Sequence, residues 1–414
     1  MMNDSTQRQG PLAGYRVLEM GSTIAGPFCG RLLADFGAEV IKVEPAEGDP
    51  LRKKGRHFHD ISLYAASIFR NKATIAVDLR KPEGQDVIKK LIPHCDIVIE
   101  NFRPGGLEKW GLGYEHLSAI NPGIVMVRIS GYGQTGPYSR FPGYGIISEG
   151  VSGLRHMTGD PDRPPSRVAV SFTDCLTAVY SCFGAVMALL HREKTGEGQM
   201  IDAALYETAF SFMESHVTAY SKLGIVPKRT GSAQSHSVVN NTFVTKDQEY
   251  IHIAASSDYV FPRLAKAIGR PDLLEDERYG KAIARTQHAD ALNDIVAKWV
   301  ARYDMIEAQK LLHAADVPAM GIYTMAEIFK DPHFKARDML IEMPDPELGS
   351  VTVPGVVPKL SKTPGTVRHT GHRIGEDTRA VLTGIAGLGE ADVDALAAAG
   401  VVTCRKASVK ESAA

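Results

Sequence analysis

The sequence predicts an α/β protein with a parallel sheet in a large domain and a second, smaller α/β domain. In the first half of the chain, short β-branched runs such as YRVLEM, AEVIKVE, DIVIENF and IVMVRIS alternate with helical segments. This alternation is typical of parallel strands joined by crossover helices. Loops rich in glycine and proline, including PAEGDP, NFRPGG and GYGQTGP, separate these runs. Because such loops form ligand crevices at the ends of parallel strands, we expect the binding site there.

The second half of the chain predicts a different arrangement. Residues 171–223 are mostly helical, and the apolar stretch 178–190 contains Ser181 and is shorter than the roughly 20 residues that span a bilayer, which predicts a buried helix. Beyond Gly231, the strand-like TFVTKDQEYIHIAA and amphipathic helices near 259, 290–303 and 305–315 predict the smaller domain. VPAMGIY predicts a strand, MLIEMPDPELGSVTVPG a hairpin, and EADVDALAAAG a last helix that ends at Gly400.

Composition excludes several classes of function. The 414 residues include 47 Lys and Arg against 48 Asp and Glu, so no overall field favours nucleic acid or an anionic membrane as a partner. The N-terminal MMNDSTQRQG has no apolar core, which predicts a cytoplasmic protein. The five cysteines are scattered without C-x-x-C spacing, which argues against a disulfide framework or a metal site.

The segment GYGQTG at 131–136 matches the glycine pattern of dinucleotide-binding sites. Pro137 and Pro142 follow directly, however, and no acidic residue ends a following strand at the required distance. A glycine-rich turn is therefore the preferred interpretation of this segment.

Asp174 begins an apolar helix in the segment SFTDCLTAVYSCFGAVMALLH. Aspartate at a helix start is usually an N-cap residue. The same place in the helix dipole also keeps a carboxylate ionised and able to act as a nucleophile. The local sequence leaves both interpretations open.

Several long segments, taken together and in order, resemble the class III CoA-transferase family, which includes formyl-CoA transferase and carnitine CoA-transferase. They are PLAGYRVLEMGSTIAGPFCGRLLADFGAEVIKVEPAEGDP, NKATIAVDLRKPEG, ENFRPGGLEKWGLGYEHLSAINPGIVMVRISGYGQTGP, the Asp174 helix and KTGEGQMIDAALYE. The resemblance covers nearly the whole chain. It implies that coenzyme A or an acyl-CoA is a substrate, with no permanently bound cofactor.

The resemblance also implies roles for individual residues. Asp174 matches the catalytic nucleophile of the family. Lining of the CoA site is implied for Thr23, Val77, Arg80, Asn101, Phe102 and Lys109. The chain departs from some relatives at the adenine end, where it has Pro45 in place of Arg and no basic residue at Pro142, so we expect Arg140 to contact the adenine end instead. Taken without the resemblance, Arg80 and Lys109 are solvated charges and Val77 a core strand residue. Phosphate recognition by Lys or Arg makes the assignments physically reasonable.

The expected reaction moves CoA from an acyl-CoA to a carboxylic acid through an aspartyl anhydride and an aspartyl-CoA thioester. Tyr144 and His236 are candidates for contact with the acid; their alternatives are a packing residue and a surface histidine. Basic and hydroxyl groups in the predicted small domain favour a dicarboxylate or hydroxydicarboxylate, with succinyl-CoA as donor. These groups are Lys228, Arg229, Ser232, Ser235 and His236.

Ile24 stands where the oxalate-using branch has Gln, and TGSAQSH has one glycine instead of a glycine run. Both departures argue against oxalate as the acid.

Two other functions compete with transfer. An α-methylacyl-CoA racemase would use the same scaffold, but PGYGIIS stands where that branch has a His-Asp pair, so a second proton carrier is missing; His156 would need a different geometry. A catalytically silent CoA-binding protein is the other alternative, and retention of Asp174 argues against it.

The resemblance further implies an interlocked homodimer, in which each chain threads through the other. On this basis we expect a Rossmann-like, CoA-binding large domain over residues 1–220, a small domain over 225–325, and a return to the large domain over 326–414.

Overall fold

The computed structural model describes residues 9–234 and 236–405, so Ser235 lies outside the described residues. The chain divides into two compact units. The larger comprises Met1–Leu154, Val168–Ser221 and Lys335–Ala414, and the smaller comprises Arg155–Arg167 and Lys222–Phe334. Within the smaller unit, Arg229 donates hydrogen bonds to the carbonyl oxygens of His156, Asp160 and Arg163, which attaches the first of its two segments to the second.

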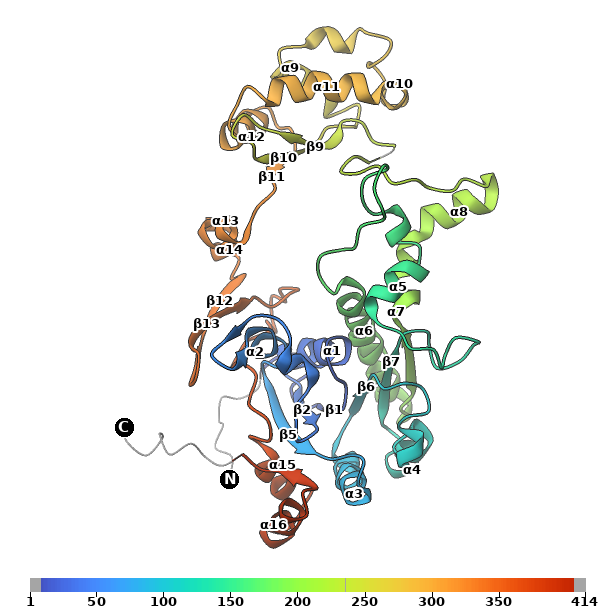
Figure 1. Cartoon of the computed structure of the whole chain (residues 1–414), viewed down its shortest axis with the longest axis vertical. Coiled ribbons are helices and arrows are strands. Elements are labelled where there is room, and N and C mark those ends of the chain that lie inside the picture. Colours follow the sequence, from blue (N-terminus) through green and yellow to red (C-terminus); the bar gives the residue numbers. More distant parts are fainter. Residues whose placement is uncertain (1–8, 235, 406–414) are drawn as a thin grey trace. The chain divides into compact units, whose positions relative to one another are not determined.

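A seven-stranded sheet forms the centre of the larger unit, with the strand order β14-β5-β2-β1-β6-β7-β8 (Figure 1). Neighbouring strands are parallel except β14, which pairs antiparallel with β5. This arrangement confirms the predicted α/β class with a mostly parallel sheet. The strands are β1 (Arg16–Glu19), β2 (Glu39–Glu44), β5 (Lys72–Val77), β6 (Ile97–Glu100), β7 (Val125–Ser130), β8 (Met200–Ala204) and β14 (Val402–Thr403).

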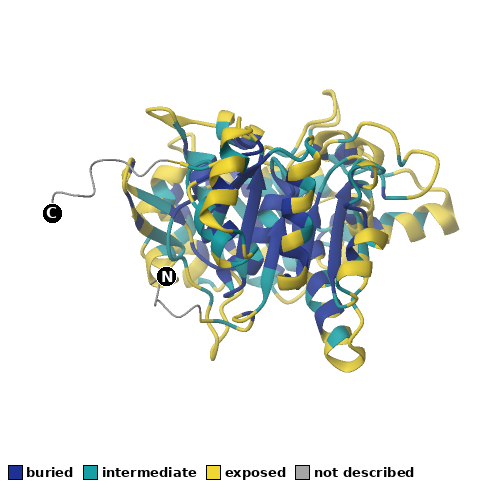
Figure 2. Ribbon diagram, turned by 90° about the horizontal axis from the view of Figure 1, so that it is seen from below, coloured by how far each residue is buried: buried dark blue, intermediate teal, exposed yellow. Residues whose placement is uncertain are grey.

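Helices cover both faces of this sheet because its strands are apolar on both faces. Val17 of β1 packs in the cluster with α1 and α6, whereas the next residue, Leu18, packs in the cluster with α3, α4, α15 and α16. Figure 2 shows the strands as buried and the outer faces of the helices as exposed. These helices are α1 (Ala25–Asp35), α3 (Pro82–Leu91), α4 (Tyr114–Ile120), α6 (Phe172–Thr195), α15 (Thr378–Gly384) and α16 (Glu390–Ala398).

Helix α6 differs from its prediction as a buried helix. It is longer than the apolar stretch, and only one face is buried, with Ala178 and Ala185 fully covered. Phe183 and Leu190 on the other face are 63% and 54% exposed. Among the described residues α6 is also the helix long and apolar enough to cross a membrane, although core helices of soluble proteins meet the same criterion.

The larger unit also contains elements outside the seven-stranded sheet. The predicted hairpin is confirmed as β12 (Leu340–Asp345) and β13 (Gly349–Pro354), paired antiparallel. The last predicted helix is confirmed as α16, which ends shortly before Gly400. The other elements are β3 (His57–Phe58), β4 (Ile61–Ser62), α2 (Leu63–Ile68), α5 (Gly145–Val151) and α7 (Leu205–Phe210), with α8 (Glu214–Leu223) and α14 (Pro332–Ala336) each spanning a unit boundary.

The smaller unit has a core of its own. An antiparallel sheet in the order β11-β10-β9 packs against helices through a cluster that includes Phe243, Ile251, Leu264 and Trp299. Its elements are β9 (Asn240–Val244), β10 (Tyr250–Ala254), α9 (Phe261–Ala267), α10 (Ala282–Gln287), α11 (Ala289–Val300), α12 (Met305–Ala314), β11 (Ala319–Gly321) and α13 (Met325–Lys330).

Candidate active site

The strand order of the large sheet locates a ligand crevice. Strands β1, β2 and β5 follow one another outward in one direction, and β6, β7 and β8 follow outward in the other, so the order reverses between β1 and β6. In open parallel sheets, ligands bind outside the carboxyl ends of the strands at this point. A cavity of about 490 Å³ lies there. It is lined by residues that follow β1 (Ser22, Thr23, Ile24) and β6 (Asn101, Phe102, Arg103), by Ser130 and Gly131 at the end of β7, and by Lys54, Tyr144 and Asp174.

The turn after β1 is held by side chains from other segments. The Asn101 side chain accepts a hydrogen bond from Ser22 N at 2.7 Å and donates one to Ser22 O at 2.9 Å. Thr23 has a φ of 66°, a left-handed conformation that is strained for a β-branched residue. Its N–H donates to Asp49 Oδ1 at 3.0 Å. Hydrogen bonds to Asn101 and Asp49 therefore fix this strained turn at the edge of the cavity.

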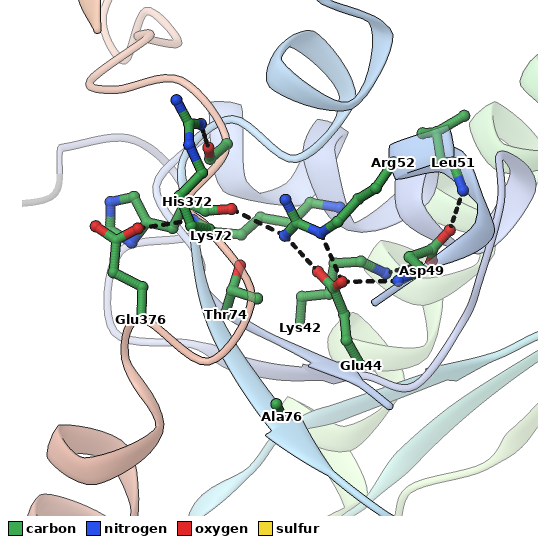
Figure 3. Close-up of polar contacts among 12 residues, drawn as sticks. Lys42, Glu44, Asp49, Leu51, Arg52, Lys72, Thr74, Ala76, His372 and Glu376 are labelled. Atoms are coloured by element: carbon green, nitrogen blue, oxygen red, sulfur yellow. Dashed lines mark hydrogen bonds and ion pairs between the residues drawn. The ribbon is translucent and has the colours of Figure 1, made fainter. Parts of the chain in front are cut away.

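Beneath this turn lies a buried cluster of charges, of which Figure 3 shows Lys42, Asp49 and Lys72. Lys42 Nζ is 2.9 Å from Asp49 Oδ2 and 3.3 Å from Glu19 Oε1, and it donates to Gly21 O at 3.0 Å. Lys72 Nζ is 2.6 Å from Glu19 Oε2. These four charged side chains are almost completely buried. Buried charges are stable only when each is paired, so the cluster fixes the turn and the strand ends together.

The electrostatics of the cluster follow from burial and pairing. Burial lowers the pKa of Lys72 to about 8, and Glu19 opposes this shift. Burial also acts to lower the pKa of Lys42, but Asp49 and Glu19 outweigh it and raise that pKa. Although burial acts to raise it, the pKa of Asp49 is lowered because Lys42 and backbone N–H groups stabilise the carboxylate.

A second set of contacts joins this cluster to the C-terminal part of the chain (Figure 3). Glu44 Oε2 accepts a hydrogen bond from Asp49 N at 2.8 Å. The Arg52 guanidinium binds both oxygens of Glu44, at 2.7 and 2.6 Å, and donates to His372 O at 2.9 Å. The turn from Asp49 to Arg52 is thus anchored on both sides.

Asp174 lies in the first turn of α6, and Ser171 rather than Asp174 occupies the N-cap position. Burial raises the pKa of Asp174 to about 6, while its own backbone N–H and Lys54 lower it and Glu149 raises it further. At neutral pH the carboxylate is therefore mostly ionised, yet it is less solvated than a surface aspartate. A partly desolvated carboxylate at the edge of a cavity is suited to nucleophilic attack.

The sequence-predicted site residues divide into three groups. Thr23, Asn101, Phe102, Tyr144 and Asp174 line the one cavity. Four others belong to the same unit but not to the lining of this cavity: buried Val77, exposed Lys109 and Arg140, and exposed Arg80, which pairs with Asp78. His236 is exposed in a turn of the smaller unit.

Sequence reasoning missed three residues of this region. Lys54 and Ser22 line the cavity, and Gly145 approaches Asp174 closely. The signal for Lys54 was its place after the turn-forming GDP segment. Within residues 9–234 and 236–405, no group of three or more His, Cys, Asp or Glu side chains is placed to hold a metal ion.

The chain resembles known proteins over nearly its whole length. The family model described as CoA-transferase family III matches residues 12–378. The chain belongs to CoA-transferase family III. The match confirms the resemblance that the sequence motifs indicated, and it makes CoA-transfer the activity of the enzyme.

Relatives of known activity match over nearly the full length of this transferase. It is 46% identical over 394 residues to a succinyl-CoA–D-citramalate CoA-transferase of Chloroflexus aurantiacus, covering 95% of this chain and 98% of the relative. It is 42% identical over 398 residues to the beta subunit of a succinyl-CoA–L-malate CoA-transferase of the same organism, with the same coverage. A crystal structure of a CaiB/BaiF family protein from Brucella suis has a TM-score of 0.82 and 34% identity, covering 91% of this chain and all of that one.

Proposed function

We propose that this transferase moves CoA from succinyl-CoA to a C4 or C5 dicarboxylic or hydroxydicarboxylic acid, with Asp174 as the nucleophile. The observation that carries the proposal is the place of Asp174. Its partly desolvated carboxylate lines the cavity at the switch point of the sheet, together with Thr23, Asn101 and Phe102. The two relatives whose names include citramalate and malate support the class of acid.

The proposed reaction has four covalent steps. The ionised Asp174 carboxylate attacks the thioester carbonyl and expels CoA thiolate, which leaves a mixed anhydride. The thiolate then attacks the aspartyl carbonyl, which releases succinate and leaves an aspartyl-CoA thioester. The incoming carboxylate attacks this thioester, giving a second anhydride and CoA thiolate. The thiolate finally attacks the acyl carbonyl of the acceptor, which forms the new acyl-CoA and restores the carboxylate.

CoA binding is proposed along the carboxyl ends of the strands next to the cavity. Asn101 and Phe102 follow β6, and Val77 is the last residue of β5, which is separated from β6 by β2 and β1. Arg80 and Lys109 are exposed cations suited to the phosphates of CoA, and Arg140 is proposed for the adenine end. Tyr144 and His236 remain the candidates for contact with the acid.

Transfer is favoured over racemisation by the composition of the cavity. A racemase needs two proton carriers on opposite sides of the α-carbon. Of the described residues that line the cavity, none is a histidine, and His156 belongs to the smaller unit. Gly145, which has no side chain to carry a proton, occupies the position beside the Asp174 carboxylate.

A homodimer is proposed from the apolar surface of the larger unit. The side chains of Tyr180, Phe183 and Met187 on α6 are exposed, and the ring centroids of Tyr180 and Phe212 lie 6.2 Å apart in an edge-to-face arrangement. Side chains at these spacings share one face of a helix, and a contiguous exposed apolar face is a feature of protein interfaces. Interlocking of the two chains, the two-domain division at about residues 225 and 325, and cytoplasmic location stay part of this proposal.

The test is the mass of the enzyme after incubation with succinyl-CoA. Wild type is expected to gain a CoA adduct that hydroxylamine removes, and to transfer CoA to malate or citramalate. Asp174→Ala is expected to form no adduct and to transfer no CoA. An Asp174→Ala variant that kept the adduct would contradict the assignment of the nucleophile.

A further inference from the structure

The cavity that contains Asp174 is also lined by a lysine that forms no ion pair with any described residue. Lys54 lines this cavity and is exposed. Among the described residues its ammonium group forms no ion pair within 4.0 Å. By contrast, the buried lysines beneath the same turn, Lys42 and Lys72, are both paired with carboxylates. Lys54 is therefore available to an anionic ligand.

The backbone of Lys54 is held firmly in place. Residues Pro50–Lys53 form one 3₁₀ turn whose first N–H groups are capped by Asp49, which accepts a hydrogen bond from Leu51 N at 2.8 Å. Lys54 N donates to Leu51 O at 3.0 Å, and Lys54 O accepts a hydrogen bond from Ser62 Oγ at 2.6 Å. Because the buried charge cluster fixes Asp49, it also fixes the point from which the Lys54 side chain starts.

Three successive basic residues of this segment have different surroundings. Arg52 binds the buried Glu44. Lys53 contributes to a separate cavity bordered by the C-terminal segment, whose lining does not include Asp174. Only Lys54 of the three lines the cavity with Asp174. The positive charge of Lys54 also lowers the pKa of Asp174, which places the two groups within electrostatic range.

We propose that Lys54 determines the specificity for dicarboxylates by binding the distal carboxylate of the acid. The inference rests on the proposed function, because it requires the acid to react at Asp174. When one carboxyl group of the acid is at Asp174, a second carboxylate is attracted to the Lys54 ammonium in the same cavity. A monocarboxylic acid of equal length gains nothing from this contact. Arg103 lines the same cavity but follows Phe102, on the side proposed for CoA.

The experiment compares two acids that differ only in the distal group, L-malate and 2-hydroxybutyrate, with succinyl-CoA as the donor. The quantity measured is the ratio of kcat/KM for malate to kcat/KM for 2-hydroxybutyrate. In a double-displacement reaction both values report attack on the same aspartyl-CoA thioester, so the donor cancels in the ratio. Lys54→Gln is expected to lower the ratio about 10- to 100-fold, the usual effect of losing a charged hydrogen bond. Lys54→Arg is expected to retain most of the wild-type ratio, because it keeps the positive charge.

Lys53→Gln is the matched control, because it removes a neighbouring charge from the same turn without altering the Asp174 cavity. It is expected to leave the ratio unchanged. The inference is overturned if Lys54→Gln lowers kcat/KM for both acids by the same factor, or if Lys53→Gln lowers the ratio equally. An equal rise in KM for succinyl-CoA and butyryl-CoA, with the acid ratio unchanged, would assign Lys54 to the phosphates of CoA instead. A wild type that forms no CoA adduct would contradict the proposed function itself, and this inference with it.

Discussion

Gly145 at the start of α5 packs directly against the carboxylate of Asp174. A Cβ atom at position 145 would lie 2.1 Å from Asp174 Oδ2 and 2.6 Å from Thr173 Oγ1, distances at which the carboxylate must move. Glycine is therefore required at this position by close approach to the proposed nucleophile, and α5 limits the positions that the carboxylate can take.

Gly145→Ala is expected to reduce kcat sharply while the protein stays folded. The added methyl group displaces the carboxylate from its place in the cavity, and a displacement of about 1 Å can cost about 100-fold in rate. The control is Gly150→Ala in the same helix, where a Cβ would meet no atom within 4 Å. That variant is expected to keep full activity and to gain about 0.5–1 kcal/mol of stability from the higher helix propensity of alanine. Steady-state kinetics give kcat for both variants, and thermal unfolding shows whether each is folded. Equal kcat values for Gly145→Ala and Gly150→Ala would contradict the proposed role of this contact.

The pKa of Asp174 predicts how activity depends on pH. Burial raises this pKa to about 6, and the nucleophile must be ionised, so kcat/KM for succinyl-CoA is expected to fall as the pH drops through about 6. Lys54 lowers the pKa of Asp174, so removing its charge in Lys54→Gln raises that pKa. The acidic limb of the kcat/KM profile, the pH range over which activity is lost, then moves to higher pH. Lys53→Gln should leave the limb where it is in wild type. A limb that does not move in Lys54→Gln would show that the group titrating in this range is not Asp174.

Asp49→Asn is expected to destabilise the larger unit. The substitution keeps the shape of the side chain but removes one of the two carboxylate charges paired with buried Lys42, and breaking a buried ion pair from one side costs about 3–5 kcal/mol. The effect has a defined pH dependence. Because the pKa of Asp49 is lowered in the folded protein, its stabilisation is present above the unfolded pKa of about 4 and is lost as the pH falls through the folded value.

The control for Asp49→Asn is Asp86→Asn on α3. Asp86 pairs with Lys89 at 3.1 Å on the surface, with 65% of its side chain exposed, and exposed pairs contribute little. Denaturant unfolding at pH 7 should separate the two variants clearly. Equal midpoints would mean that the buried cluster does not stabilise the unit more than a surface pair does.

The sheet and part of the site were predictable from local sequence. Strands buried on both faces read as continuous β-branched runs, so β2 and β7 were evident as AEVIKVE and IVMVRIS. Loops at the carboxyl ends of such strands are where ligands bind, and Thr23 and Asn101 both stand in loops of this kind. The resemblance to the family supplied the role proposed for Asp174.

Other features depend on contacts between distant segments, which local sequence does not encode. The importance of Gly145 is evident only from its close approach to Asp174 in the folded chain. The importance of Lys54 is evident only because the folded turn places it in the same cavity. Helix α6 was expected to be buried because its apolar stretch is too short to span a bilayer. The sequence pattern does not distinguish burial in the core from an apolar face such as that of Phe183, which is exposed in the single chain.

The exposed face of α6 predicts the effect of a charge placed on it. If a second copy of the chain covers Phe183, then Phe183→Asp buries an unpaired carboxylate in the interface, which strongly disfavours association. We expect light scattering to give a dimer mass for wild type and a monomer mass for the variant. The control is Ile120→Asp at the end of α4, on the opposite face of the sheet, which should leave the mass unchanged. A wild-type monomer, or a Phe183→Asp variant that remains dimeric, would show that this face is not the interface.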